Sequence, residues 1–73
     1  MHSGIYTKEH KRLIQCLVKA RQETGLNQTE AAKLLGHTQS YISKIEMGQR
    51  KVDVLELKKI ARIYKKEITY FLQ

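Results

Sequence analysis

Residues 25–48 read GLNQTEAAKLLGHTQSYISKIEMG, and glycines at both ends and near the middle divide this stretch into two short segments. Asn27 stands in front of the first segment with Glu30 three positions later, which is the spacing of a capping box at a helix N-terminus. Gly36 ends the segment, because glycine readily adopts the left-handed conformation that often follows a helix. The pattern therefore predicts a helix over residues 28–35.

A second helix is predicted immediately after a turn of three residues. Thr38 is a suitable N-cap for it, and the segment 39–46 ends before Gly48. Both helices are too short to be stable alone in water, so they must pack against the rest of the chain. Two helices joined by a short turn that contains glycine form a helix-turn-helix motif, here residues 28–46. Its inward side chains are expected to be Ala31, Ala32, Leu35, Ile42 and Ile45.

The segments on either side of the motif share the helical period. Apolar residues three and four positions apart predict a helix over residues 7–23. Asp53 and Glu56 repeat the capping-box spacing and begin a fourth helix. The expected core stripe of that helix consists of Val54, Leu57, Ile60, Ala61 and Tyr64. Thr69 is expected to cap a last helical turn over residues 70–72.

These elements predict one compact all-α domain of five helices over residues 1–73, since no segment keeps the strand period for long. The chain is 41% hydrophobic, enough to fold around a core, but its 73 residues leave no room for a deep active-site cleft. One cysteine cannot form an internal disulfide and fits a reducing, intracellular compartment. No apolar run is long enough to span a membrane. The net charge of +7 predicts an anionic partner. Nucleic acid is the first candidate, and an anionic membrane surface is the second.

The outward face of the second motif helix carries side chains suited to the DNA major groove. Gln39, Ser40, Ser43 and Lys44 project together from it. Glutamine can pair with adenine, lysine can donate to guanine, and serine is short enough to let the helix approach. An ordinary solvated face is the alternative, which the motif spacing and the excess of positive charge disfavour. Tyr41 is expected either to pack inward or to lie along a sugar-phosphate wall.

Contacts with phosphates are expected around this face. The N-termini of both short helices offer free N–H groups and the positive end of the helix dipole. Gln28, the first residue of its helix, is placed to bind a phosphate and to brace Gln39. Arg50 and Lys51 follow the second helix and are expected to contact the flanking DNA backbone.

A catalytic or metal site is not expected. His2, His10 and His37 have no partner at zinc-ligand spacing, and Cys16 has no neighbouring base that would activate it. The chain also lacks a set of nucleophile and base and a glycine-rich phosphate loop. We therefore expect no enzymatic activity and no cofactor.

Residues 25–36 and 40–48 together resemble the lambda-repressor/Cro-like family of bacterial and phage regulators, also called the XRE family. The resemblance extends over about residues 8–72, nearly the whole chain. It implies a five-helix DNA-binding domain that binds operators as a symmetric dimer, and we expect a cytoplasmic protein of bacterial or phage origin. Position by position, it implies a phosphate contact for Gln28. The positions that face DNA in the family are matched by Thr38, Gln39, Ser40, Ser43 and Lys44.

The resemblance also concerns residues outside the DNA-facing positions. Arg21 and Glu46 match a partly buried ion pair between the first and third helices of relatives. Met47 replaces the asparagine that usually precedes the glycine, so the phosphate contact of that asparagine is not carried over. Val52 replaces a frequent proline.

The sequence thus predicts a sequence-specific regulator of double-stranded DNA, a repressor that binds a near-palindromic operator as a homodimer. The apolar C-terminal residues Ile68, Tyr70 and Phe71 are assigned to the dimer interface. The alternative is a helix-turn-helix module for protein interaction, such as an antitoxin or a bridging factor. A protein partner, either a toxin or another regulator, therefore stays open.

Overall fold

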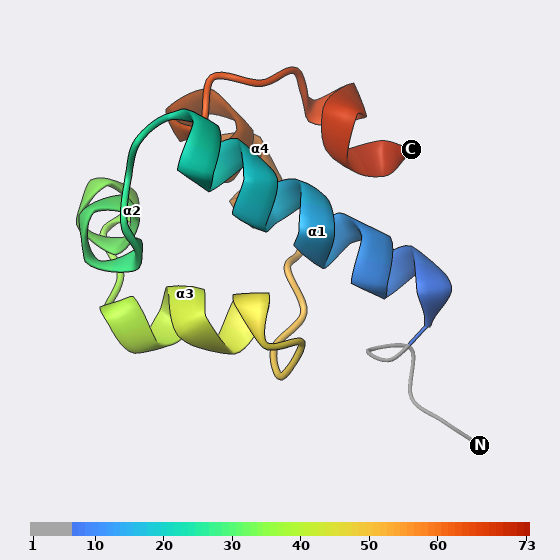
Figure 1. The fold of residues 1–73 in the computed structure, drawn as a ribbon, viewed down its shortest axis with the longest axis horizontal. Coiled ribbons are helices and arrows are strands. Elements are labelled where there is room, and N and C mark those ends of the chain that lie inside the picture. The colour runs from blue at the N-terminus through green and yellow to red at the C-terminus, as the bar shows by residue number, and fades with distance from the viewer. Residues whose placement is uncertain (1–6) are drawn as a thin grey trace.

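The computed structural model describes residues 7–73 as four α-helices and one 3-10 helix, with no strand in that range (Figure 1). Their bounds are α1 (Lys8–Glu23), α2 (Gln28–Leu35), α3 (Gln39–Glu46), α4 (Val54–Ile63) and η2 (Ile68–Leu72). The predicted all-α fold is confirmed, and both motif helices begin and end where the sequence predicted. The fifth element is a 3-10 helix rather than an α-helix.

The elements are arranged around α1, which crosses the middle of the view in Figure 1. Helix α3 packs against α2 and α1, while α2 also packs against α4. The 3-10 helix packs against α1 and α4. In Figure 1, α3 lies below α1 and η2 lies above it, so α1 separates the second motif helix from the C-terminal end.

Local signals in the sequence determine where the helices begin. The side chain of Asn27 accepts from the Glu30 N–H at 2.8 Å, and the Glu30 carboxylate accepts from the Asn27 N–H at 2.9 Å. Asp53 and Glu56 form the same reciprocal pair at the start of α4, at 2.7 and 3.0 Å. Gly36 has φ +75°, a left-handed conformation that glycine adopts without strain. Both predicted capping boxes and this C-cap are confirmed.

The core draws buried side chains from all five elements. No polar or charged residue in the described range is buried with them. All of the predicted inward residues of α2 and α3 belong to this core, as do four of the five predicted for the fourth helix and its end. The buried residues are Leu17, Ala20, Ala31, Ala32, Leu35, Ile42, Ile45, Leu57, Ile60, Ala61, Tyr64 and Phe71.

Two expectations for the C-terminal half are wrong. Val54 is 62% exposed, because side chains lean toward the N-terminus of a helix and Val54 is the first residue of α4, so it points past the packed part. Thr69 does not cap the last turn, because the turn begins at Ile68, two residues earlier than predicted, and Thr69 lies inside it. The Tyr70 N–H donates to the Glu67 carbonyl at 3.0 Å, which closes the turn without a side-chain cap.

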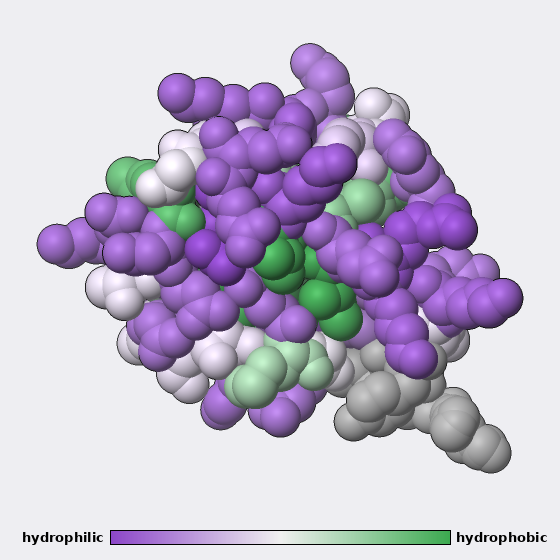
Figure 2. Space-filling model, in the orientation of Figure 1, coloured by the Kyte–Doolittle hydropathy of each residue, from purple (hydrophilic) through white to green (hydrophobic). Residues whose placement is uncertain are grey.

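The face of the molecule drawn in Figure 2 is mainly hydrophilic. Figure 2 shows charged and polar side chains over most of one face, with apolar side chains in small separate areas. Among residues 7–73, no helix combines the length and the apolar character that crossing a bilayer requires.

Candidate nucleic-acid interface

Two buried isoleucines set the orientation of α3. Ile42 and Ile45 are 2% and 3% exposed, so the opposite side of the helix faces solvent. Three of the four residues predicted to contact bases are exposed there, and the fourth, a serine, is half-buried. The three exposed residues are Gln39, Ser40 and Lys44, and the serine is Ser43. The structure thus brings the four predicted side chains together on α3.

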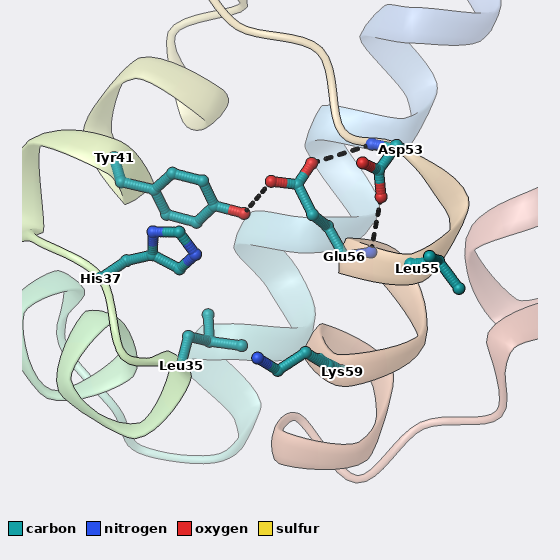
Figure 3. Close-up of a pocket in the computed structure, with 7 residues that line it drawn as sticks. All are labelled: Leu35, His37, Tyr41, Asp53, Leu55, Glu56 and Lys59. Carbon is teal, nitrogen blue, oxygen red and sulfur yellow. Dashed lines mark hydrogen bonds between the residues drawn. The ribbon is translucent and has the colours of Figure 1, made fainter.

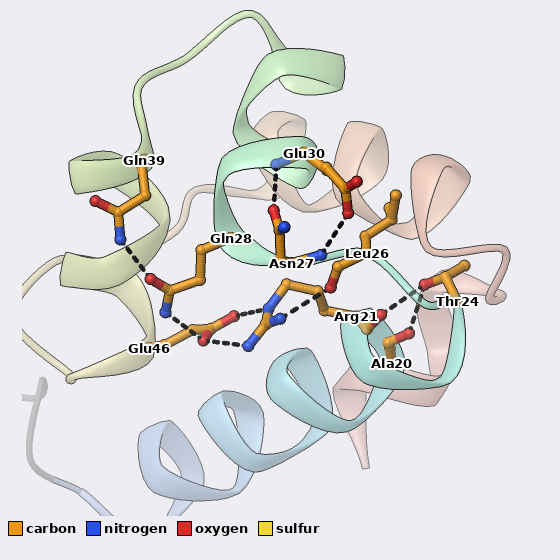
Figure 4. Close-up of polar contacts among 9 residues, drawn as sticks. All are labelled: Ala20, Arg21, Thr24, Leu26, Asn27, Gln28, Glu30, Gln39 and Glu46. Atoms are coloured by element: carbon orange, nitrogen blue, oxygen red, sulfur yellow. Dashed lines mark hydrogen bonds and ion pairs between the residues drawn. The ribbon is translucent and has the colours of Figure 1, made fainter.

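A chain of side-chain hydrogen bonds reaches α3 from α1 and α2 (Figure 4). Arg21 of α1 donates to Glu46 from Nε at 2.7 Å and from Nη2 at 3.0 Å. Gln28 donates from Nε2 to Glu46 Oε1 at 2.9 Å, and Gln39 donates from Nε2 to Gln28 Oε1 at 2.5 Å. The expected ion pair and the expected brace between the glutamines are both confirmed. We call these four residues the α2 flank of α3.

The order of donors and acceptors in the α2 flank follows from the chemistry of its members. An ionised carboxylate only accepts, so Gln28 must turn its amide N–H₂ toward Glu46. The Gln28 carbonyl oxygen then faces Gln39, which must donate through its own N–H₂. The Oε1 of Gln39 and its second N–H remain available, a paired acceptor and donor beside the outer face of α3.

The ion pair gives the α2 flank a rigid base. The side chains of Arg21 and Glu46 are only 12% and 9% exposed. Arg21 also donates from Nη1 to the Leu26 carbonyl at 2.9 Å, so one guanidinium connects α1, the α1–α2 loop and α3. The hydrogen bond to Glu46 raises the pKa of Arg21 above its ordinary value, which keeps this charge in place at any pH that proteins encounter.

A second cluster lies on the side of α3 that faces α4 (Figure 3). The rings of His37 and Tyr41 are stacked, with centroids 3.7 Å apart and planes at 8°. The Arg50 guanidinium lies 4.8 Å from the Tyr41 ring centroid. The Tyr41 hydroxyl donates to Glu56 Oε2 at 2.9 Å, and Arg50 Nη2 donates to the same oxygen at 2.7 Å. We call these four residues the α4 flank of α3.

Glu56 joins the α4 flank to the start of α4. Its other oxygen, Oε1, accepts from the Asp53 N–H in the capping box. Burial opposes the ionisation of Glu56, but the bonds from Asp53 and Tyr41 and the charge of Arg50 hold the pKa of Glu56 below its ordinary value. Burial, helped by the bond to Glu56, raises the pKa of Tyr41 to about 12. At neutral pH the hydroxyl therefore stays a donor and the carboxylate an acceptor.

The other residues predicted to contact DNA surround the outer face of α3. Gln28 opens α2 and is half-buried, with its amide bonded as described. Thr38 is the N-cap of α3, and its Oγ1 accepts from the Tyr41 N–H at 3.3 Å. Arg50 is paired with a carboxylate yet keeps 42% of its side chain exposed. Lys51 is exposed in the loop between α3 and α4.

Tyr41 and Glu56 make contacts that the sequence does not predict. The sequence left Tyr41 open between two orientations, and it assigned Glu56 to the capping box alone. In the structure Tyr41 is half-buried and bonded to a carboxylate fifteen positions later. No local pattern links two residues so far apart, because their contact depends on how α3 and α4 are packed.

The C-terminal residues assigned to a dimer interface differ in their exposure. Phe71 is 4% exposed and belongs to the core, so it has almost no surface left for a second chain. Ile68 and Tyr70 are half-buried against the core, and the neighbouring Leu72 is 62% exposed. The available apolar surface at this end therefore comes from the neighbours of Phe71.

A second exposed apolar surface lies at the start of α4. Leu55 is 68% exposed, next to the exposed Val54. Leu55 lines a cavity of about 140 Å³ together with Tyr41 and Glu56 (Figure 3). The helical period does not reveal this surface, because it places Val54 among the inward residues of the fourth helix.

No metal centre is found in the part of the chain that the structure describes: residues 7–73 hold no group of three or more His, Cys, Asp or Glu side chains that could bind an ion. His10 is half-buried in α1, and Cys16 is a half-buried free thiol. His37 takes part in the α4 flank, and His2 lies outside the described residues.

Comparison with known proteins agrees with this geometry. A family model described as helix-turn-helix matches residues 17–71, which include the whole motif. The crystal structure of the restriction-modification controller protein C.AhdI from Aeromonas hydrophila is similar, with a TM-score of 0.82. The two sequences are 28% identical, and the match covers 96% of this chain and 99% of that chain. No curated protein sequence matches this one.

The family match and the structure lead to the same conclusion. The match covers most of the chain, and the two motif helices expose the polar face by which such motifs contact DNA. Both observations indicate a DNA-binding regulator rather than an enzyme. The chain belongs to the lambda-repressor/Cro-like, or XRE, family of helix-turn-helix transcriptional regulators.

Proposed function

We propose that this regulator is a sequence-specific repressor that binds a near-palindromic operator as a homodimer. The main support for the proposal is the α2 flank. Its hydrogen bonds link Arg21 to Glu46, Glu46 to Gln28 and Gln28 to Gln39, and so orient the Gln39 amide. The likeness to a restriction-modification controller supports a role in transcription control.

Gln39 is the principal base reader in this proposal. Its available Oε1 and N–H match the N6 donor and the N7 acceptor that adenine presents in the major groove. Ser40 and Ser43 let α3 approach the bases, and Lys44 donates to guanine or to a nearby phosphate. Because the direction of the Gln39 amide is fixed before binding, the contact costs little ordering of the side chain.

Phosphate contacts hold α3 in register. The N-terminus of α2, with Gln28, and the N-terminus of α3, with Thr38, present N–H groups suited to phosphate oxygens. Arg50 and Lys51 contribute charge beyond the end of α3. The remaining cations raise the rate of encounter with DNA, since a net charge of +7 attracts a polyanion at long range.

A homodimer would place two α3 helices in successive major grooves, about 34 Å apart. We assign the interface to Ile68 and Tyr70, with the exposed Leu72 beside them. Ile68→Asp should then convert a dimer to a monomer in light scattering, whereas Leu55→Asp should not. The reverse result would move the interface to the start of α4.

Selection of bound sites from random duplex DNA tests the proposed function. A palindromic consensus with adenine at the position nearest the twofold-related Gln39 residues is the expected result. Enrichment of a consensus without twofold symmetry would contradict the dimer. Failure to enrich any sequence would contradict operator binding and favour a protein-interaction module, such as an antitoxin.

A further inference from the structure

Tyr41 occupies a central place in the α4 flank, and the base contacts proposed above do not use it. Helix α3 packs against α2 and α1. The bond from the Tyr41 hydroxyl to Glu56 adds a contact between α3 and α4. The stacked His37 ring comes from the turn between the motif helices. Tyr41 thus contacts side chains from the turn, from the α3–α4 loop and from α4.

The same cluster confines Arg50. Because the His37 ring covers one face of Tyr41 at 3.7 Å, the guanidinium 4.8 Å from the ring centroid must lie over the other face. The ion pair with Glu56, at 2.7 Å, restrains the guanidinium in a second direction. One N–H of this guanidinium donates to Glu56 and the side chain is 42% exposed, so some of its five N–H donors can reach a partner in solvent.

The two flanks lie on nearly opposite sides of α3. Gln39 and Tyr41 are two positions apart, which places them about 200° apart around a helix. The major groove is about 12 Å wide, and a helix with its side chains is about 10–12 Å across. A helix in that groove therefore has one phosphate backbone on each side, and the α4 flank faces the backbone opposite to the one near α2.

We propose that Tyr41 and Glu56 are positioning residues for Arg50, holding its guanidinium at the edge of α3 for contact with a phosphate of the second DNA strand. The inference rests on the proposed function, because it requires α3 to enter the groove. A planar guanidinium stacked on a ring keeps its direction in a way that a lysine ammonium does not. The contact then holds α3 laterally while the α2 flank orients the base reader.

A double-mutant cycle tests this role. Arg50→Ala should weaken binding to any duplex by about three- to tenfold and lower the salt slope by about one. Tyr41→Leu should weaken binding by about two- to fivefold, and the double variant should bind no more weakly than Arg50→Ala alone. Tyr41→Phe, which keeps the ring, should recover most of the loss caused by Tyr41→Leu. Arg62→Ala, which removes an exposed cation from the last turn of α4, is the matched charge control and should change affinity less than about twofold.

A second measurement needs no DNA. In the free protein, relaxation of the Arg50 Nε–H should report a more mobile guanidinium in Tyr41→Leu and in Glu56→Gln than in the wild type. Glu56→Gln serves here if Tyr41→Leu fails to fold, because glutamine can still accept from the Asp53 N–H. Unchanged relaxation in the variant that folds would overturn the positioning role.

The outcomes separate the two proposals. If the wild type binds no duplex, the proposed function fails and the phosphate contact fails with it. If the wild type binds a selected site but the losses from Tyr41→Leu and Arg50→Ala multiply in the double variant, only the positioning inference is overturned. Lost coupling of this kind would mean that Tyr41 acts on α3 independently of Arg50.

Discussion

The two flanks of α3 stabilise the same helix by different means. The α2 flank is a linear chain of hydrogen bonds that begins at an ion pair with 12% and 9% exposure. In the α4 flank, two stacked rings lie beside an ion pair whose side chains are 42% and 20% exposed. A directional chain that starts from a part-buried ion pair can fix which atom of an amide faces a base. A solvated ion pair is worth less energy and is better suited to holding a charge near a phosphate.

The two flanks correspond to the separate sources of affinity and specificity in DNA binding. Phosphate contacts supply affinity and register for any sequence, whereas contacts with base edges discriminate between sequences. The rigid flank carries the residue that would discriminate, and the exposed flank carries the cation.

The largest expected effect is on stability. Arg21→Ala or Glu46→Ala leaves a nearly buried charge without its partner and should lower the free energy of unfolding by about 3–5 kcal/mol. Urea unfolding followed by circular dichroism measures it. Lys66→Ala is the control, because it breaks the more exposed pair with Glu23 and should leave the unfolding midpoint almost unchanged. Equal small losses in all three variants would show that the α2 flank has no rigid base.

The next effect concerns the brace between the two glutamines. Gln28→Ala removes a proposed phosphate contact and frees the Gln39 amide, so it should weaken binding to the preferred duplex by about 1–3 kcal/mol. The loss on unrelated duplexes should be smaller, since only the phosphate contact is lost there. Fluorescence anisotropy at one fixed salt concentration gives both values. Identical losses on both duplexes would argue that the brace plays no part in specificity.

A smaller effect is expected for the loop cation Lys51. Lys51→Ala should weaken binding to all duplexes alike and flatten the dependence of log K on log salt by about one unit. Lys58→Ala, on the exposed side of α4, is the control and should leave the slope nearly unchanged. A change in sequence preference in Lys51→Ala would instead place Lys51 among the base readers.

The smallest effect concerns ionisation within the folded protein. Burial raises the pKa of Tyr41 to about 12, and it raises the pKa of Tyr64 similarly, to about 12. A folded-state pKa above the ordinary 10.0 means that the associated stability is complete below pH 10 and is lost as the pH rises toward 12. Absorbance at the tyrosinate band should show a late transition that shrinks in Tyr41→Phe. A single transition near pH 10 for every tyrosine would contradict the burial of both rings.

Acid should act on the other member of the same hydrogen bond. The pKa of Glu56 is held below its ordinary 4.5, so its contribution to stability is present above that pH and is lost as the pH falls through the lowered value. Glu56→Gln should make thermal stability less dependent on pH in this acid range. An unchanged dependence would show that the capping box and the ion pair do not rely on the charge.

Local features of this fold could be predicted from the sequence, and contacts between distant elements could not. The capping boxes at Asn27 and Asp53 and the left-handed Gly36 are properties of four or five consecutive residues, and they determined the ends of the helices correctly. Val54 was misassigned because the helical period says which side faces inward, but not how far along its length a helix is covered. The last helical turn was predicted over residues 70–72, whereas the 3-10 helix extends over Ile68–Leu72.

The candidate site was predicted unevenly for the same physical reason. The outer residues of α3 follow from the periodicity of one helix, and the Arg21–Glu46 pair followed from the family resemblance. The α4 flank depends on the angle and separation between α3 and α4, which no short segment encodes. The direction of the Gln39 amide could not be predicted either, because it depends on the hydrogen bonds from Gln39 to Gln28 and from Gln28 to Glu46.

We infer that the α2 flank presents Gln39 as a base reader. The most direct measurement compares wild type and Gln39→Ala on a selected duplex and on a scrambled duplex of the same length and composition, at the same salt concentration. We predict a loss of about 1–3 kcal/mol on the selected duplex and almost none on the scrambled one. Equal losses on both duplexes, or no loss on either, would contradict the claim.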